Sequence, residues 1–173
     1  MRTDPWPHFI VDNFFSNRDF ENLVTISRSI FRDISPKEKV IKTISTLDDY
    51  WSNTYGPVAL DCLNKLNRKK AEYYDRFQLD IQAVHDDEPS SEFVHVDRKD
   101  KLLSIVVYGC PDNHVGTFIG DTKNKLTPVE WMPNRALIFS RGENTWHKFP
   151  TTGLGPRVTF NINLYTDYFD ERK

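Results

Sequence analysis

The chain has few cysteines and no long apolar run. Only two cysteines occur among its 173 residues, Cys62 and Cys110, and neither belongs to a Cys-x-x-Cys pair, which argues against a zinc site or a disulfide framework. No hydrophobic stretch has the length of a membrane span, and the N-terminal residues from Met1 to Pro5 lack the apolar segment of a signal peptide. We therefore expect a cytoplasmic protein with reduced thiols and no membrane partner.

An excess of positive charge is also missing. The formal net charge is -2 and the pI is about 6.2. Nucleic-acid binding requires clustered Lys and Arg side chains that neutralise phosphates, so this balance argues against a nucleic-acid partner. Two short basic runs, Asn67–Lys70 and Arg98–Lys101, are interpreted as the solvated end of a helix and a solvated turn.

Aromatic residues are plentiful by comparison. They make up 13% of the chain, while hydrophobic residues as a whole reach a modest 38%. Large rings can fill a compact β core. A chain of 173 residues without internal repeats is long enough to bury such a core as one unit. We therefore expect residues 1–173 to form a single domain.

The first 72 residues favour a short strand and two helices. Residues 8–11 predict the strand. Ser16, with Asp19 three positions later, predicts the start of a helix over residues 17–31. Gly56 and Pro57 predict the start of a second helix that ends near Lys70, and residues 37–55 are expected to be a loop with a little helix. This region is expected to support the core that follows.

The pattern changes to strands after Tyr73. Residues 77–83 alternate between apolar and polar side chains, which is typical of a half-buried strand. Short apolar segments then recur between turn signals, including residues 102–108, 116–119 and 135–139. Many short strands separated by turns indicate a β-sandwich or barrel. We expect residues 73–167 to form this β core.

A group of spaced polar residues points to a metal site. His95 and Asp97 stand two positions apart, so on extended backbone both side chains face the same way, and His147 follows fifty residues after Asp97. Two imidazoles and one carboxylate form the facial ligand set of non-haem Fe(II) oxygenases. Arg157 and Thr159, again two positions apart, are suited to binding a carboxylate by charge-assisted hydrogen bonds.

A second His-x-Asp triplet, His85 and Asp87, is the alternative pair of ligands. It opens an acidic, turn-rich stretch that contains Pro89, which favours a loop. His95 and Asp97 are instead separated from the apolar strand at residues 102–108 only by a short polar turn. We therefore prefer His95 and Asp97.

The order and spacing of these residues resemble the Fe(II)/2-oxoglutarate-dependent dioxygenases. The opening from Pro5 to Ser16 is similar to that of the prolyl-hydroxylase-like members. The resemblance implies a mainly β fold with supporting α-helices, the double-stranded β-helix, also called the cupin-like jelly roll. It also implies Fe(II) held by His95, Asp97 and His147, and 2-oxoglutarate bound by Arg157, Thr159 and Tyr108. The reaction would use dioxygen, release succinate and carbon dioxide, and hydroxylate an unactivated C–H bond, with ascorbate as a candidate reductant.

The substrate is less well defined. The resemblance implies a small molecule or peptide, hydroxylated on a peptidyl or free amino-acid side chain of the prolyl type. Residues 86–93 are expected to form a mobile lid, and its acidic side chains favour either a cationic substrate or simply a solvated loop. Gln82 could line the pocket, as could Asn163 without direct contact to the co-substrate, and His114 and Trp146 could lie at the rim.

A different class of protein also fits a metal site on this fold. The chain could be a cupin-like metal-binding or ligand-binding module without turnover. Arg157 and Thr159 argue against that alternative, because such a module does not need a carboxylate clamp. The sequence makes no prediction of the oligomeric state.

Overall fold

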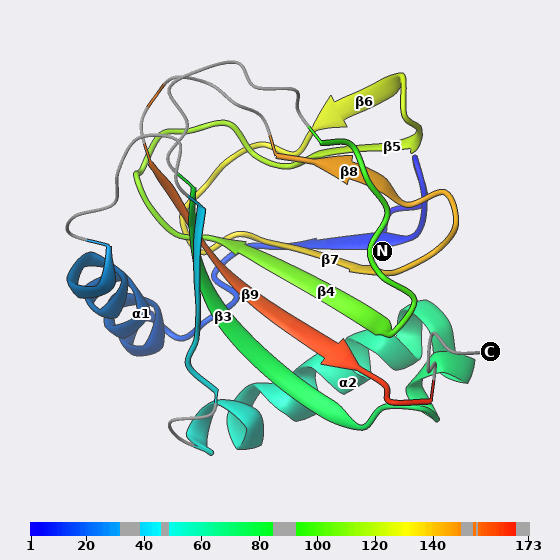
Figure 1. Ribbon diagram of the computed structural model, residues 1–173, viewed down its shortest axis with the longest axis horizontal. Helices are drawn as coiled ribbons and strands as arrows, with labels where there is room; N and C mark the ends of the chain where they lie inside the picture. Colours follow the sequence, from blue (N-terminus) through cyan, green and yellow to red (C-terminus); the bar gives the residue numbers. More distant parts are fainter. Residues whose placement is uncertain (32–38, 46–48, 85–92, 150–153, 155, 169–173) are drawn as a thin grey trace.

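A computed structural model describes residues 1–31, 39–45, 49–84, 93–149, 154 and 156–168 (Figure 1). The elements in chain order are β1 (His8–Val11), α1 (Asn17–Ile30), β2 (Lys39–Thr43), α2 (Tyr50–Ala71), β3 (Arg76–Val84), β4 (Lys101–Tyr108), β5 (Phe118–Thr122), β6 (Lys125–Pro128), β7 (Ala136–Ser140), β8 (Trp146–Lys148) and β9 (Arg157–Tyr165). None of the helices described is long and apolar enough to cross a membrane.

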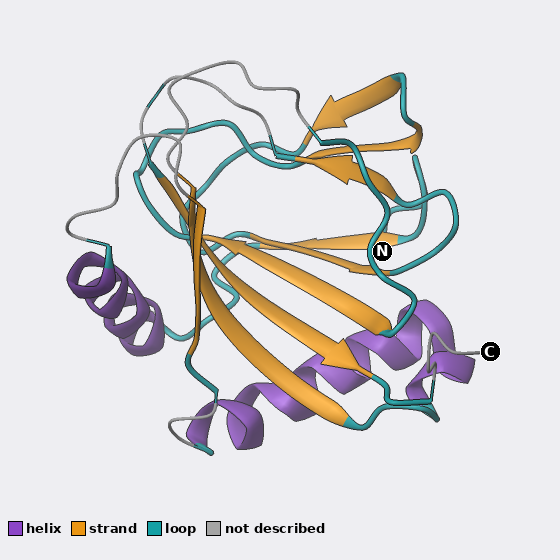
Figure 2. Cartoon of the chain, in the orientation of Figure 1, coloured by secondary structure: helices purple, strands orange, loops and turns teal. Residues whose placement is uncertain are grey.

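The strands form two antiparallel sheets. The larger sheet has six strands in the order β1-β7-β4-β9-β3-β2, and the smaller has three in the order β6-β5-β8. The two sheets face one another, while α1 and α2 lie on the side of the large sheet away from the small one (Figure 2). One face of the large sheet is therefore directed toward the small sheet, and the other face is covered by the helices.

Strand β9 shows how the sequence divides between these two faces. Its even-numbered residues, from Val158 to Leu164, belong to the buried cluster that packs against the helices. Its odd-numbered residues, from Arg157 to Asn163, line a pocket on the opposite face. This alternation follows from the two-residue period of a strand, so a single segment supplies both stability and a polar pocket wall.

Helix α1 begins where the sequence predicts. The Ser16 hydroxyl accepts a hydrogen bond from the Asp19 backbone N–H at 3.2 Å, and Tyr55 of α2 donates to the Asp19 carboxylate at 2.6 Å. Burial of Tyr55 and its bond to Asp19 raise the pKa of Tyr55 to about 12. The cap of α1 thus also joins the two helices.

The segment between the helices departs from the sequence prediction. Helix α2 begins at Tyr50 rather than near Pro57, because Trp51 and Tyr55 are buried against Phe15 and this tertiary packing extends the helix. The preceding residues, expected to be loop, include strand β2, which pairs with the edge of β3. The prediction of a loop with a little helix was therefore wrong for β2, whereas the first residues of α2 supply the short helical part. Polar edge strands such as β2 lack a clear apolar alternation of their own.

Candidate metal and co-substrate site

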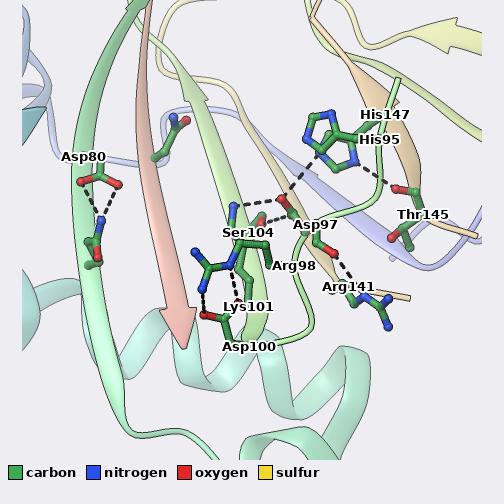
Figure 3. Close-up of polar contacts among 12 residues, drawn as sticks. Asp80, His95, Asp97, Arg98, Asp100, Lys101, Ser104, Arg141, Thr145 and His147 are labelled. Carbon is green, nitrogen blue, oxygen red and sulfur yellow. Dashed lines mark hydrogen bonds and ion pairs between the residues drawn. The ribbon is translucent and has the colours of Figure 1, made fainter. Parts of the chain in front are cut away.

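The structure brings His95, Asp97 and His147 together. The backbones of His95 and His147 exchange two hydrogen bonds of 3.0 Å, which join the segment before β4 to strand β8. Asp97 follows two residues after His95, and the ligand atoms of all three side chains lie within 4.8 Å of one another. Figure 3 shows the two imidazole rings above the Asp97 carboxylate. This donor set fits an octahedral divalent metal bound on one face.

The Asp97 carboxylate is buried and held from two sides. Ser104 Oγ donates to Oδ2 at 2.6 Å, and Lys101 Nζ donates to Oδ1 at 2.9 Å. The same Oδ1 lies 3.9 Å from His147 Nε2 and therefore faces the space between the ligands. Burial alone would raise the pKa of Asp97, but the charge of Lys101, the neighbouring imidazole of His147 and the Ser104 bond hold it below its ordinary value. The ligand is thus ionised and oriented.

Both histidines present the same nitrogen to this space. The Nδ1 of His147 lies 2.9 Å from the Thr145 carbonyl oxygen, and that of His95 lies 3.1 Å from the Phe93 carbonyl oxygen. Because a carbonyl only accepts, each Nδ1 carries the proton and each Nε2 keeps a lone pair for a metal. Burial also lowers the pKa of His147, which favours the neutral ligand form.

Lys101 corrects one sequence interpretation. It was expected in a solvated turn, but it is the first residue of β4. Its side chain is only 20% exposed and pairs with Asp97. Arg98 is solvated as expected, with a side chain 73% exposed that pairs with Asp100 (Figure 3). The reason for the difference is that the buried carboxylate of Asp97 attracts the nearest flexible cation.

Arg157 is the most unusual side chain of the pocket. It is 4% exposed, and its guanidinium lies over the rings of Trp131 and Phe149 at 5.6 and 5.3 Å. Its one hydrogen bond among the described residues is a long one, 3.5 Å, to the Val115 carbonyl oxygen, and none of their carboxylates pairs with it. Burial lowers the pKa of Arg157 to about 10. A buried cation without an anion is unfavourable unless a ligand supplies one.

One pocket connects the metal ligands with Arg157 and Thr159. Its volume is about 240 Å³, and Gln82 and Asn163 line it as well. Further polar lining residues that the sequence analysis did not assign are Lys39, Asp80, Lys101, Ser104, Thr117, Lys148, Asn161 and Tyr165. The two-residue alternation that places Gln82 and Asn163 in the pocket would also have placed Asp80 and Asn161 there.

Three other predicted site residues do not line this pocket. The Tyr108 ring is fully buried and stacks on Trp131, and its hydroxyl accepts a hydrogen bond from the Thr117 backbone N–H at 2.9 Å. Tyr108 thus lies behind Thr117, which does line the pocket. His114 packs beside Trp131, and Trp146 lies beneath the ammonium of a lysine.

The alternative ligand pair falls outside the described residues. His85, Asp87 and the expected lid up to residue 92 are among the positions that the structure does not describe. Phe93, at the end of that segment, is described: it is 77% exposed and its ring stacks on His95 with a centroid distance of 5.3 Å. An exposed aromatic ring therefore covers one face of a candidate metal ligand.

Comparisons with known proteins agree with this architecture. No protein-family model and no curated protein matches the sequence. Among solved structures, a prolyl-4-hydroxylase from Pseudomonas putida is 14% identical, with 92% of each chain covered and a TM-score of 0.65. A Trichoplax adhaerens prolyl hydroxylase, solved with a peptide fragment of hypoxia inducible factor, is 13% identical over 92% of this chain and 84% of that one, with a TM-score of 0.68. A dioxygenase for auxin oxidation from Arabidopsis thaliana, solved with 2-oxoglutarate, is 13% identical over 95% and 85%, with a TM-score of 0.67.

These likenesses define the fold. The chain has the jelly-roll architecture of 2-oxoglutarate oxygenases, with the prolyl hydroxylases among its structural neighbours. The predicted fold class, mainly β with supporting helices, is confirmed.

Proposed function

We propose that the protein is an Fe(II)- and 2-oxoglutarate-dependent oxygenase that hydroxylates an unactivated C–H bond of an amino-acid side chain, peptidyl or free. The reaction would consume dioxygen and release succinate and carbon dioxide, with ascorbate keeping the iron reduced. A structural neighbour solved with a peptide supports a peptidyl substrate. A neighbour solved with 2-oxoglutarate supports the co-substrate.

One observation carries the proposal: a buried, unpaired guanidinium shares a pocket with a facial set of metal ligands. Arg157 has no carboxylate partner among the described residues, and His95, Asp97 and His147 line the same 240 Å³ space. A co-substrate with a carboxylate at one end and a chelating group at the other would satisfy both features. The alternative, a metal-binding module without turnover, leaves the burial of Arg157 unexplained.

Each residue has a defined part in this arrangement. The Nε2 atoms of His95 and His147, with Oδ1 of Asp97, would hold the metal, and Ser104 fixes the orientation of the carboxylate. When bound, Fe(II) supplies the dioxygen chemistry that side chains cannot provide.

At the other end of the pocket, Arg157 and Thr159 would bind and orient the distal carboxylate of 2-oxoglutarate. Phe139 and Phe149, which line the pocket, limit the access of water.

The decisive experiment is anaerobic addition of Fe(II) and 2-oxoglutarate to the purified protein. A weak visible charge-transfer band is expected, because the chelating co-substrate and the metal occupy the same site. Arg157→Met should require a much higher 2-oxoglutarate concentration for the same band, whereas Arg68→Met, at an exposed position on α2, should behave as the wild type. Metal binding without any band would favour the cupin-like module and refute the proposal.

A further inference from the structure

The pocket contains a second polar group whose role the co-substrate does not explain. Asp80 of β3 and Asn161 of β9 are cross-strand partners, and both line the pocket. Figure 3 shows Asp80 on β3, across β9 from Asp97 and the imidazole rings. Directly paired side chains on one face of a sheet lie close enough to act on one ligand group.

Asp80 is a buried carboxylate without a cation. It is 6% exposed and accepts hydrogen bonds from Thr43 Oγ1 at 2.6 Å and from Gln78 Nε2 at 2.8 and 3.0 Å. Both donors are neutral, and among the described residues no Lys, Arg or His forms an ion pair with Asp80. A carboxylate has about four acceptor positions, so these three bonds leave capacity for another donor.

Asn161 adds a second unmet acceptor at the same place. Its Nδ2 donates to Gln82 Oε1 at 3.2 Å, which fixes the direction of the side chain. Its Oδ1 is buried and has no hydrogen-bond donor among the described residues. An unsatisfied buried oxygen costs roughly 1–3 kcal/mol, and a donor entering beside Asp80 would remove that cost.

Apart from the candidate metal ligands and Asp80, the charged side chains that line the pocket are cations, namely Lys39, Lys101, Lys148 and Arg157. The ammonium of Lys148 lies 5.3 Å from the centre of the Phe118 ring. Lys101 pairs with Asp97, and Arg157 would pair with the distal carboxylate of 2-oxoglutarate. Lys39 is exposed, with its ammonium 5.5 Å from the centre of the Phe149 ring. Asp80 therefore remains as a negative group that a positively charged ligand would complement.

We infer that Asp80 and Asn161 form a subsite for the protonated amine or guanidinium of the substrate, so that the proposed oxygenase acts on a basic amino-acid side chain. This inference rests on the proposed function. A pocket of about 240 Å³ is small compared with the roughly 300–1,000 Å³ of typical small-molecule sites. Because 2-oxoglutarate would occupy part of this space, the inference requires a slender substrate group, such as the side chain of lysine or arginine.

The test measures binding of chosen probes to the protein with Fe(II) and 2-oxoglutarate under nitrogen, by calorimetry. The probes are free lysine, free arginine, norleucine, Nε-acetyl-lysine, glutamate and a terminally blocked tripeptide with a central lysine. Lysine or arginine is expected to bind at least tenfold more tightly than norleucine or Nε-acetyl-lysine, because only the basic probes carry a positive charge on the side chain. The blocked tripeptide then separates a peptidyl source from a free one.

A matched pair of variants assigns the effect to Asp80. Asp80→Asn keeps an acceptor for Thr43 and should weaken lysine binding about 10- to 100-fold, the range for a hydrogen bond to a charged group. Asp61→Asn, at an exposed position on α2, should change nothing. The control Asp61→Asn should also show the same Fe(II)/2-oxoglutarate band and the same slow succinate release without amine as the wild type.

Three results would overturn the inference. They are equal binding of lysine and norleucine by the wild type, unchanged lysine binding by Asp80→Asn, or a preference for glutamate that Lys39→Met abolishes. The comparison of lysine with Nε-acetyl-lysine uses only the wild type, so the inference stays testable even if Asp80→Asn does not fold. Absence of the 2-oxoglutarate band would refute the proposed function instead. A normal band together with equal binding of lysine and norleucine would refute only the inference.

Discussion

Replacement of Arg157 by methionine should stabilise the ligand-free protein while removing its response to 2-oxoglutarate. Burial moves the pKa of Arg157 from 12.5 to about 10, which corresponds to a cost on the order of 3 kcal/mol for holding the charged form in the fold. Arg157 is protonated in both the folded and the unfolded chain at neutral pH, so this cost is present at every pH well below 10. Methionine has a similar length and no charge.

Part of that gain is lost with the ring contacts. The guanidinium lies 5.6 and 5.3 Å from the ring centres of Trp131 and Phe149, near the outer limit for cation–π contacts, so each contributes roughly 0.5–1 kcal/mol. We therefore expect a net increase of about 1–2 kcal/mol in the free energy of unfolding of Arg157→Met. For a chain of this length, each kcal/mol corresponds to about 2–4 °C in melting temperature.

Thermal and urea denaturation, with and without 2-oxoglutarate, would measure the effect. The order of stability should reverse: the variant is more stable alone, and the wild type gains about 3 kcal/mol when 2-oxoglutarate is present at a hundred times its Kd. The variant should gain nothing at that concentration. A destabilised variant would show that Arg157 is an ordinary structural residue. Equal stabilisation of both proteins by 2-oxoglutarate would show that the co-substrate does not use its guanidinium.

Three further outcomes are expected. Asp97→Ala should abolish metal binding in a calorimetric titration, and retained binding would refute the ligand assignment. Gly116→Ala should lower the melting temperature strongly, because its Cβ would lie 1.9 Å from the Val129 carbonyl oxygen, whereas Gly142→Ala meets only a side-chain methyl at 3.3 Å and should have a small effect. Burial lowers the pKa of His8 in the folded chain, so as the pH falls the His8 imidazole is protonated in the unfolded chain before it is protonated in the folded chain. Stability in urea should therefore fall as the pH drops below about 6.5, and His8→Phe should flatten that fall; an unchanged slope would refute it.

The candidate metal ligands could be named from the sequence because most of their geometry is local. His95 and Asp97 share a face by their two-residue spacing, and the same rule places Arg157 and Thr159 on one face of β9. The prediction that needed long-range information was the approach of His147, and it came from a resemblance in spacing rather than from a local rule.

The features that sequence reasoning missed depend on tertiary contacts. Helix α2 starts early because the rings of Trp51 and Tyr55 stack on one another and are buried. This tertiary packing outweighs the local start signal at Pro57. The role of Lys101 depends on the buried charge of Asp97. The residue types around position 101 do not reveal that this carboxylate is buried. Pairing of edge strand β2 depends likewise on a partner far away in the chain.

The alternation along β9 has a practical meaning for altering the protein. Positions 161 and 163 can be randomised in a directed-evolution library with Arg157, Thr159 and the hydrophobic set from Val158 to Leu164 left intact. Selectivity and folding would then vary independently within nine consecutive codons. Deletion of one codon from the middle of the strand would have the opposite result. Beyond the deleted position, apolar side chains would face the pocket and polar ones such as Asn163 would face the helices.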